Sequence, residues 1–331
     1  MPELHASLII VLILAVIFDF FNGFHDAANA IATSVSTRVL SPRQAIIMAA
    51  ILNMLGALTG TAVAKTVGSG IIDPAAVTQL TIISALVAAI FWNIITWYLA
   101  LPTSSSHALI AAIIGSGVAA TGKYSVLKWE GIEKVFSGLV FSPLVGFIVG
   151  LAFMVLLMWL LRRTPPSAVT KRFKRWQIIS AAFMAYSHGS NDAQKTMGII
   201  TMALVAGGYL HTFSVPIWVI ILCALTMAAG TAGGGWKIIK TLGMKLANLK
   251  PVHGFAAEMS AATVIEVASR IGLPLSTTHV ISSTIMGVGA SKRFSAVKWG
   301  VGGNIVMAWV ITFPACAVMA WGFYKILFFI V

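Results

Sequence analysis

The chain consists mostly of long apolar runs separated by short polar segments. A membrane span needs about 20 predominantly apolar residues, and by that measure the sequence holds about ten candidates. The first half contains candidates near residues 6–24, 43–64, 75–100, 104–120 and 135–161. The second half contains candidates near residues 176–190, 215–236, 253–272, 277–291 and 299–330. The pattern predicts an all-α polytopic membrane protein, and the number of spans changes wherever a segment is broken or re-entrant.

Composition supports a membrane protein and excludes the soluble classes. Of 331 residues, 59% are hydrophobic and 9% are charged, whereas soluble domains are roughly 45–50% apolar and about 25% charged. A soluble enzyme, a nucleic-acid-binding protein and a disordered chain are therefore excluded. The formal net charge of +13 fits the basic excess of cytoplasmic loops, so no nucleic-acid partner is expected. The two cysteines lie far apart in apolar runs, and we expect neither a cysteine metal site nor a cofactor.

A basic segment divides the chain into two halves. Residues 162–175 read RRTPPSAVTKRFKR, with six basic residues and no acid. We interpret this segment as an exposed linker, which the positive-inside rule places in the cytoplasm. It separates a first repeat, residues 1–161, from a second repeat, residues 176–331. Because each half holds about five spans, both termini are then predicted to lie outside.

Three sequence blocks recur in the same order in both halves. The block Leu101–His107 (LPTSSSH) matches Leu273–His279 (LPLSTTH), and GFHD at 23–26 matches GSND at 189–192. Further along, YSVLKW at 124–129 resembles FSAVKW at 294–299. The chain is therefore a duplication, and an odd number of spans in each half requires opposite orientations. Inverted repeats of this kind are typical of secondary transporters, whose substrate site lies at the repeat interface near the membrane midplane.

The first matched blocks place charged residues inside predicted spans. Asp26 and Asn29 are three residues apart, as are Asp192 and Lys195, so each pair shares one helix face. A charged residue within a span is costly and indicates function, although an aspartate could also cap a half-helix. We therefore predict that this group handles ions or protons, together with Asn191, which precedes Asp192. Gly23 and Gly189 are expected to break the helices here, and the flanking His25 and His188 receive less weight.

Two further acids lie in one predicted span of the second half. Glu258 and Glu266 are eight residues apart, and the first half has no acid at the matching place. We include both in the predicted coupling group. One of them could pair with Lys195 across the repeat interface, and Glu258 could instead lie near a membrane surface.

The second matched blocks combine a proline with hydroxyl residues. Proline followed by Ser or Thr is a helix-start signal, and the free N–H groups of a helix start bind anions. Two such starts facing each other could hold a tetrahedral oxyanion, although simple capping of the helices is the alternative. The predicted anion-binding hydroxyls are Ser104, Ser105, Ser106, Ser276, Thr277 and Thr278. The matched His107 and His279 are either hydrogen bonders at the helix starts or proton carriers.

These blocks resemble the PiT family of inorganic phosphate transporters, which carries a duplicated GANDVANA motif. The copies here read GFHDAANA (23–30) and GSNDAQKT (189–196). The resemblance implies an inverted-repeat carrier, a dimer, that moves phosphate with a coupling cation. It also implies that Asp26, Asn29 and Asp192 form the cation site and that the Ser/Thr clusters contact phosphate. The HGxNDxQK form of the second copy resembles the motif of a bacterial branch of this family. The resemblance implies a protein of the cytoplasmic membrane that uses protons and can carry phosphate with a divalent metal.

One departure from the family pattern concerns the coupling ion. Lys195 stands where the family has its second asparagine, and an ammonium there would repel or replace sodium. We therefore predict proton-coupled phosphate symport by alternating access. The alternatives are a sodium-coupled symporter and a carrier or channel for another oxyanion such as sulfate. A membrane-embedded hydrolase or transferase is disfavoured, because an enzyme site needs no duplication, so no enzyme activity is expected.

Overall fold

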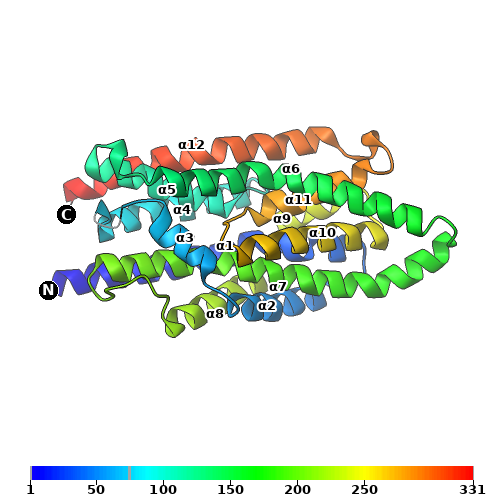
Figure 1. Cartoon of the computed structure of the whole chain (residues 1–331), viewed down its shortest axis with the longest axis horizontal. Coiled ribbons are helices and arrows are strands. Elements are labelled where there is room, and N and C mark those ends of the chain that lie inside the picture. The colour runs from blue at the N-terminus through cyan, green and yellow to red at the C-terminus, as the bar shows by residue number, and fades with distance from the viewer. Residues whose placement is uncertain (1, 74–75, 331) are drawn as a thin grey trace.

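The computed structural model describes residues 2–73 and 76–330, and the regular secondary structure of this part is helical apart from two isolated β-bridges. The first half contains α1 (Pro2–Ser36), α2 (Pro42–Ala57), α3 (Ala62–Gly70), α4 (Gln79–Tyr98), α5 (Ser105–Thr121), η2 (Tyr124–Val126) and α6 (Trp129–Leu160). The second half contains α7 (Pro166–Ala206), α8 (Ile217–Gly233), α9 (Trp236–Lys240), the π-turn η3 (Thr241–Lys245), α10 (Pro251–Arg270), α11 (Thr277–Ala290), η4 (Phe294–Ala296) and α12 (Trp299–Ile330). The helices lie roughly along one long axis (Figure 1).

Several helices are long and apolar enough to cross a membrane, and two further spans are broken. The unbroken candidates are Ala6–Ser36, Gln79–Tyr98, Trp129–Leu160 and Trp299–Ile330. Helices α2 and α3 meet at a bend of 70°, and α8 meets the segment of α9 and η3 at 62°. The candidate span at 43–64 is therefore broken by this bend, one of the broken segments that the sequence pattern allows for. Thr59 donates a hydrogen bond to the Gly56 carbonyl (2.6 Å) and helps to close α2 before the bend.

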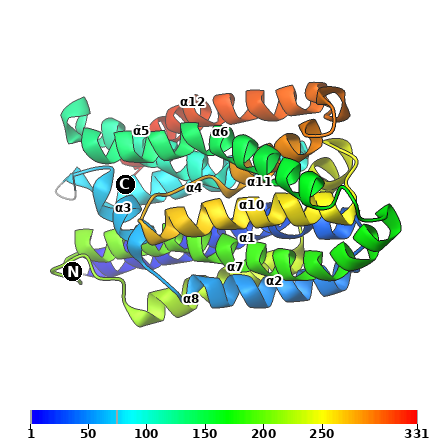
Figure 2. The ribbon, with the colours of Figure 1, turned by 45° about the vertical axis from the view of Figure 1, so that its right-hand side comes forward.

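Two helical hairpins reach the middle of the molecule from opposite ends. Hairpin α4–α5 lies toward the end that holds both termini, whereas α10–α11 extends from the other end (Figures 1 and 2). Each second arm packs closely on a long helix of the other half. A Cβ atom added at Gly115 of α5 would collide with the Ala317 carbonyl of α12, and one added at Gly287 of α11 would collide with the Phe147 carbonyl of α6. The matched glycines thus make matched contacts in the two halves.

The start of α1 and the end of α12 lie at one end of the molecule, and the turn between α6 and α7 lies at the other (Figure 1). This placement agrees with an odd number of crossings in each half, while the membrane side of each end stays a prediction. The predicted linker 162–175 is mostly helical, since α7 begins at Pro166. Its basic side chains are exposed: Arg162 and Arg163 precede α7, and the other four lie on the first turns of that helix.

The predicted helix breaks at Gly23 and Gly189 are wrong. Helices α1 and α7 run without interruption through both positions. The glycines serve close packing instead, because a Cβ at Gly23 would collide with the backbone of Met227 and one at Gly189 with the backbone of Asn53. Helix α8 therefore approaches α1, and α2 approaches α7, next to the acidic residues.

Candidate functional site

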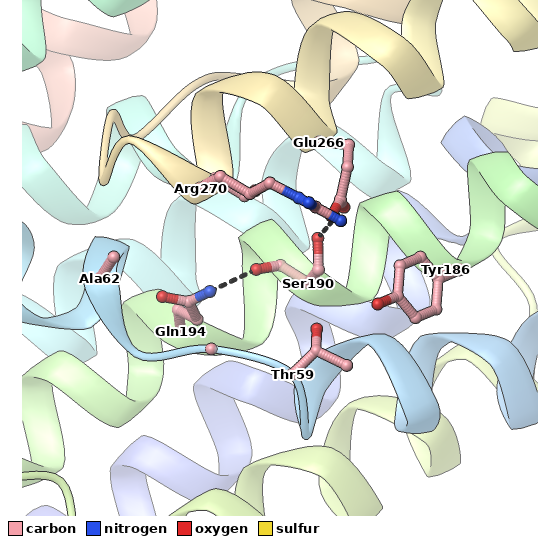
Figure 3. A pocket seen from close by; sticks show the side chains of 9 residues that line it. Thr59, Ala62, Tyr186, Ser190, Gln194, Glu266 and Arg270 are labelled. Carbon is pink, nitrogen blue, oxygen red and sulfur yellow. Dashed lines mark hydrogen bonds and ion pairs between the residues drawn. The ribbon is translucent and has the colours of Figure 1, made fainter.

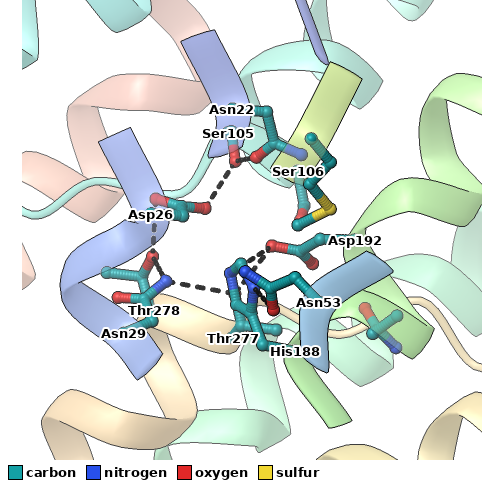
Figure 4. Close-up of polar contacts among 12 residues, drawn as sticks. Asn22, Asp26, Asn29, Asn53, Ser105, Ser106, His188, Asp192, Thr277 and Thr278 are labelled. Atoms are coloured by element: carbon teal, nitrogen blue, oxygen red, sulfur yellow. Dashed lines mark hydrogen bonds and ion pairs between the residues drawn. The ribbon is translucent and has the colours of Figure 1, made fainter. Parts of the chain in front are cut away.

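Four elements bring the predicted site residues together in the middle of the molecule. Helices α1 and α7 supply the acidic residues, and the starts of α5 and α11 supply the hydroxyl groups (Figure 4). Both hydroxyl blocks begin helices, as predicted from the Pro–Ser/Thr pattern. The Ser104 side chain accepts a hydrogen bond from the His107 backbone N–H (3.1 Å), and Ser276 accepts one from His279 (3.2 Å). These two hydroxyl oxygens therefore act as N-caps.

The first carboxylate, Asp26, is held from three sides. His25 Nδ1 lies 2.7 Å from Asp26 Oδ1, and Thr278 donates a longer hydrogen bond of 3.4 Å to the same oxygen. The Ser105 hydroxyl lies 2.8 Å from Asp26 Oδ2 and 2.6 Å from Asn22 Oδ1, so its one proton is shared between two acceptors. Because Asp26 is 2% exposed, these contacts replace water around the carboxylate.

The second carboxylate, Asp192, makes a buried ion pair with Lys195 in the same helix. Lys195 Nζ also donates to the Ser106 hydroxyl and to the Leu275 carbonyl, the latter at 3.1 Å. On the other carboxylate oxygen, His188 Nε2 lies at 3.2 Å and Thr277 donates at 2.9 Å. Asp192 thus connects α7 to the start of α11, and Lys195 connects α7 to the start of α5.

Asn29 joins the two carboxylate groups. Its side-chain nitrogen donates to Thr277 at 3.2 Å and to Thr278 at 2.9 Å, and these two threonines contact Asp192 and Asp26 respectively. With both carboxylates ionised and Lys195 protonated, the centre carries a net charge of −1. A buried charge network is a poor source of stability and an expensive one inside a membrane. The arrangement therefore indicates a binding site for ions.

The same centre offers ligands for a cation. Asp26, His188 and Asp192 each supply one ligand atom, and these atoms lie within 4.8 Å of one another. Carboxylate and imidazole ligands suit hard or borderline divalent ions. Lys195 already bonds one oxygen of Asp192, so its ammonium competes with any cation placed there.

The two glutamates of α10 lie in different surroundings. Glu258 is buried and accepts hydrogen bonds from Thr33 of α1 (2.5 Å), and from Gln177 (3.1 Å) and Ser180 of α7. Glu266 accepts from Ser190 (3.0 Å) and pairs with Arg270 (2.9 Å).

The suggested pairing of one of these glutamates with Lys195 is therefore wrong. Within the described part of the chain, the Lys195 ion pair is the one with Asp192. That contact is made within a single turn of α7, whereas the glutamates are held by α10 against other neighbours.

Three predicted residues lie beside the centre rather than in it. The Asn191 side chain donates to Ser269 of α10 at 2.9 Å, so it faces that helix. The rings of His107 and His279 pack against each other with centroids 4.4 Å apart, and His279 stacks on Trp309 of α12 at 3.9 Å. Both rings therefore pack beside the centre, and their predicted role as hydrogen bonders at the helix starts or as proton carriers stays a prediction.

The site also contains residues outside the predicted coupling group. His25 and His188 contact the two aspartates directly, although they received little weight. Asn22 shares the Ser105 hydroxyl, and Asn53 of α2 contacts His188 Nδ1 at 3.1 Å. The sequence indicates the contact between His188 and Asp192 through their spacing, since residues four apart share one helix face.

The comparisons with known proteins identify the family. A model described as "Phosphate transporter family" matches residues 22–320. A Rhizobium meliloti (strain 1021) protein named "Probable low-affinity inorganic phosphate transporter" is 49% identical over 308 residues, covering 92% of each chain. A Bacillus subtilis (strain 168) protein of the same name is 48% identical over 315 residues, covering 94% of each chain.

A solved structure is also similar. It is described as "The sodium-dependent phosphate transporter", with a TM-score of 0.88 and 26% identity, and the match covers 98% of this chain and 100% of that one. These findings confirm the resemblance found in the motifs and the expectation of a transporter rather than an enzyme. The chain belongs to the phosphate transporter family.

Proposed function

We propose that this protein carries inorganic phosphate across the cytoplasmic membrane by alternating access, with protons as the coupling ion. The observation that carries the proposal is the meeting of two helix starts with Asp26 and Asp192 (Figure 4), together with Lys195, which pairs with Asp192 and donates to Ser106. Family membership and the names of the relatives support phosphate as the substrate. All of these side chains are at most 2% exposed, so substrate reaches them only when the helices move.

Phosphate would bind through the hydroxyl groups that now hold the charged side chains. Ser105 and Thr278 bond Asp26, Thr277 bonds Asp192, and Ser106 bonds Lys195. A phosphate between the helix starts would accept hydrogen bonds from these hydroxyls and from free backbone N–H groups. Ser104 and Ser276, predicted as ligands too, contribute by fixing the two helix starts through their caps.

Charge balance is the reason to propose protons. With an asparagine in place of Lys195 the centre would carry two negative charges, and a phosphate would need several cations to enter. Lys195 supplies one of those cations permanently, so fewer coupling ions are required. Its ammonium can also give a charge-assisted hydrogen bond to phosphate, which is stronger than a neutral one.

Glu258 is the proposed proton acceptor on the path toward the linker end. Thr33, which bonds Glu258, follows Asp26 by seven residues on α1, or about 10 Å along the helix. The three side chains that donate hydrogen bonds to Glu258 are neutral. The charge of this buried carboxylate would therefore be balanced by a proton. We propose that this proton binds during inward opening.

Two finer points extend the proposal. A divalent metal carried together with phosphate would take the Asp26, His188 and Asp192 ligand set, after Lys195 has released Asp192. The homodimer implied by the family resemblance is proposed for this chain as well. Chemical cross-linking in native membranes tests the dimer, and phosphate-dependent uptake of a labelled divalent metal tests the carried complex.

The coupling ion is tested by phosphate uptake into proteoliposomes. We expect uptake driven by a proton gradient in sodium-free buffer, and we expect Lys195→Asn to lose most of this uptake and to gain sodium dependence. Lys298→Asn removes an exposed charge far from the centre and is the control. Uptake by the unmodified protein that requires sodium would overturn proton coupling and favour the sodium alternative, in line with the sodium-dependent transporter of similar structure.

Substrate identity is tested by competition. Labelled phosphate uptake is measured with an excess of unlabelled phosphate, sulfate or arsenate. We expect sulfate to compete poorly, because a protonated phosphate can donate a hydrogen bond to Asp26 or Asp192 and sulfate cannot at neutral pH. Sulfate competition equal to that of phosphate would contradict the proposed selectivity.

A further inference from the structure

A polar cavity of about 360 Å³ lies at the bend between α2 and α3. Figure 3 shows its lining, which comes from the connection between α2 and α3, the start of α3, α7 and α10. The lining includes Thr59, Tyr186, Ser190, Gln194, Glu266 and Arg270. Such a concentration of polar side chains is unexpected in an apolar helix bundle, because each buried polar group needs a partner.

This cavity adjoins a larger and strongly basic hollow of about 720 Å³. Ala62 and Arg270 line both spaces. Lys65, Lys128 and Lys134 are exposed and line the hollow together with Arg270, facing the single acid Glu130. Residues of α3 and of the start of α6 line the hollow, and these two segments lie toward the end of the molecule that holds both termini (Figures 1 and 2). A hollow lined by charges of one sign attracts ions of the other sign and raises their local concentration.

The floor of the cavity is close to the central site along α7. Ser190 and Gln194 line the cavity, and they alternate along the helix with Asp192 and Lys195, which face the centre. Gln194 closes this floor, since its Oε1 accepts hydrogen bonds from the backbone N–H groups of Val63 (2.8 Å) and Ala64 (3.3 Å) at the start of α3.

Arg270 stands at the junction of the two spaces. Its side chain is 76% exposed, and Glu266 holds its guanidinium by an ion pair at 2.9 Å. Glu266 also accepts from Ser190 on the cavity floor. A guanidinium binds a phosphate through two parallel hydrogen bonds, so an arriving phosphate would compete with Glu266 for Arg270.

We propose that the hollow and the cavity form an entry vestibule in which phosphate binds transiently to Arg270 and the three lysines. The inference rests on the proposed phosphate transport. Phosphate first binds in the basic hollow and then replaces Glu266 as the partner of the Arg270 guanidinium. It enters the central site when α3 separates from Gln194. The vestibule is a second anion site that precedes the occluded one.

The test measures phosphate uptake kinetics at low and high ionic strength. For Arg270→Gln, and for the triple variant with Lys65, Lys128 and Lys134 changed to Gln, we expect KM at low salt to rise about three- to tenfold. The maximal rate changes less than twofold, because the central site is intact. High salt weakens uptake by the unmodified protein but has little further effect on the triple variant, since salt screens exposed charges.

Two controls separate this effect from general damage. Lys298→Gln removes the counterpart of Lys128 in the duplicated motif, which lies outside the vestibule, and KM should not change. Arg270→Lys keeps the charge and should restore most of the affinity. Unchanged KM and unchanged salt dependence in the charge-removing variants would overturn the vestibule. Absence of phosphate uptake by the unmodified protein would instead refute the proposed transport function.

Discussion

At the scale of single residues, the hydroxyl residues of each matched block have two roles: one caps a helix, and the other two contact side chains of the central site. Ser104 and Ser276 cap α5 and α11, whereas the next two hydroxyls of each block reach charged or amide side chains. Ser105 illustrates the second role, because its proton is shared between Asn22 and Asp26. Its removal leaves both acceptors short of a donor in a buried site.

We therefore expect Ser105→Ala to weaken phosphate uptake. A hydrogen bond to a charged group is worth about 1.5–3 kcal/mol, so KM should rise about tenfold or more. Ser116→Ala is the matched control, since Ser116 lies in the same helix and donates only to the Ile113 carbonyl. Equal uptake by the two variants would contradict a role for Ser105 in the site.

The residues of the site were predictable to different degrees. Asp26, Asn29, Asp192 and Lys195 stand out because charged or amide groups are rare in apolar spans and recur across the duplication. Their partners were harder to predict, because the contacts join distant segments. Glu258 lies 225 residues from Thr33 in the sequence, and no local pattern specifies that such residues meet. The i,i+3 spacing of Asp192 and Lys195 permits their ion pair, but spacing alone does not exclude a glutamate of another helix as the partner of Lys195.

At the scale of helices, the sequence predicted most elements and misjudged the glycines. Nearly all candidate spans correspond to a helix, whereas Gly23 and Gly189 lie within continuous helices. A glycine in an apolar run can either bend a helix or admit a neighbouring helix, and the sequence pattern does not separate the two. The structure assigns the second role, since a Cβ at Gly189 would collide with the Asn53 backbone.

This packing predicts that Gly189→Ala destabilises the protein. Overpacking of a tight contact costs about 1–3 kcal/mol, and the displaced α2 would also pull Asn53 away from His188. We expect a lower thermal unfolding temperature in detergent. Gly303→Ala should leave stability unchanged or slightly higher, because nothing lies within 4 Å of a Cβ at that position and alanine favours the helix. A stable Gly189→Ala variant would mean that α2 and α7 can separate freely.

At the scale of the whole molecule, the duplication explains why one site is built from four distant segments. Each half contributes one long helix with an aspartate and one helix start with hydroxyls, and the two sets meet only because the halves pack against each other. The same arrangement places the matched loops around Lys123 and Lys292 after α5 and α11, the two arms that leave the centre in opposite directions (Figure 1). The proposed alternating access then requires that the central site opens toward one end of the molecule while it closes toward the other.

The predicted inverted arrangement has a direct consequence for labelling. Lys123→Cys and Lys292→Cys introduce thiols at exposed positions, whereas the native Cys223 and Cys316 are buried and give little background. With the termini outside, a membrane-impermeant thiol reagent should label the first variant in intact cells and the second only after permeabilisation. The opposite result would reverse the predicted orientation while keeping the inversion. Labelling of both variants from one side would contradict the inverted repeat itself, and with it the alternation proposed for the transport cycle.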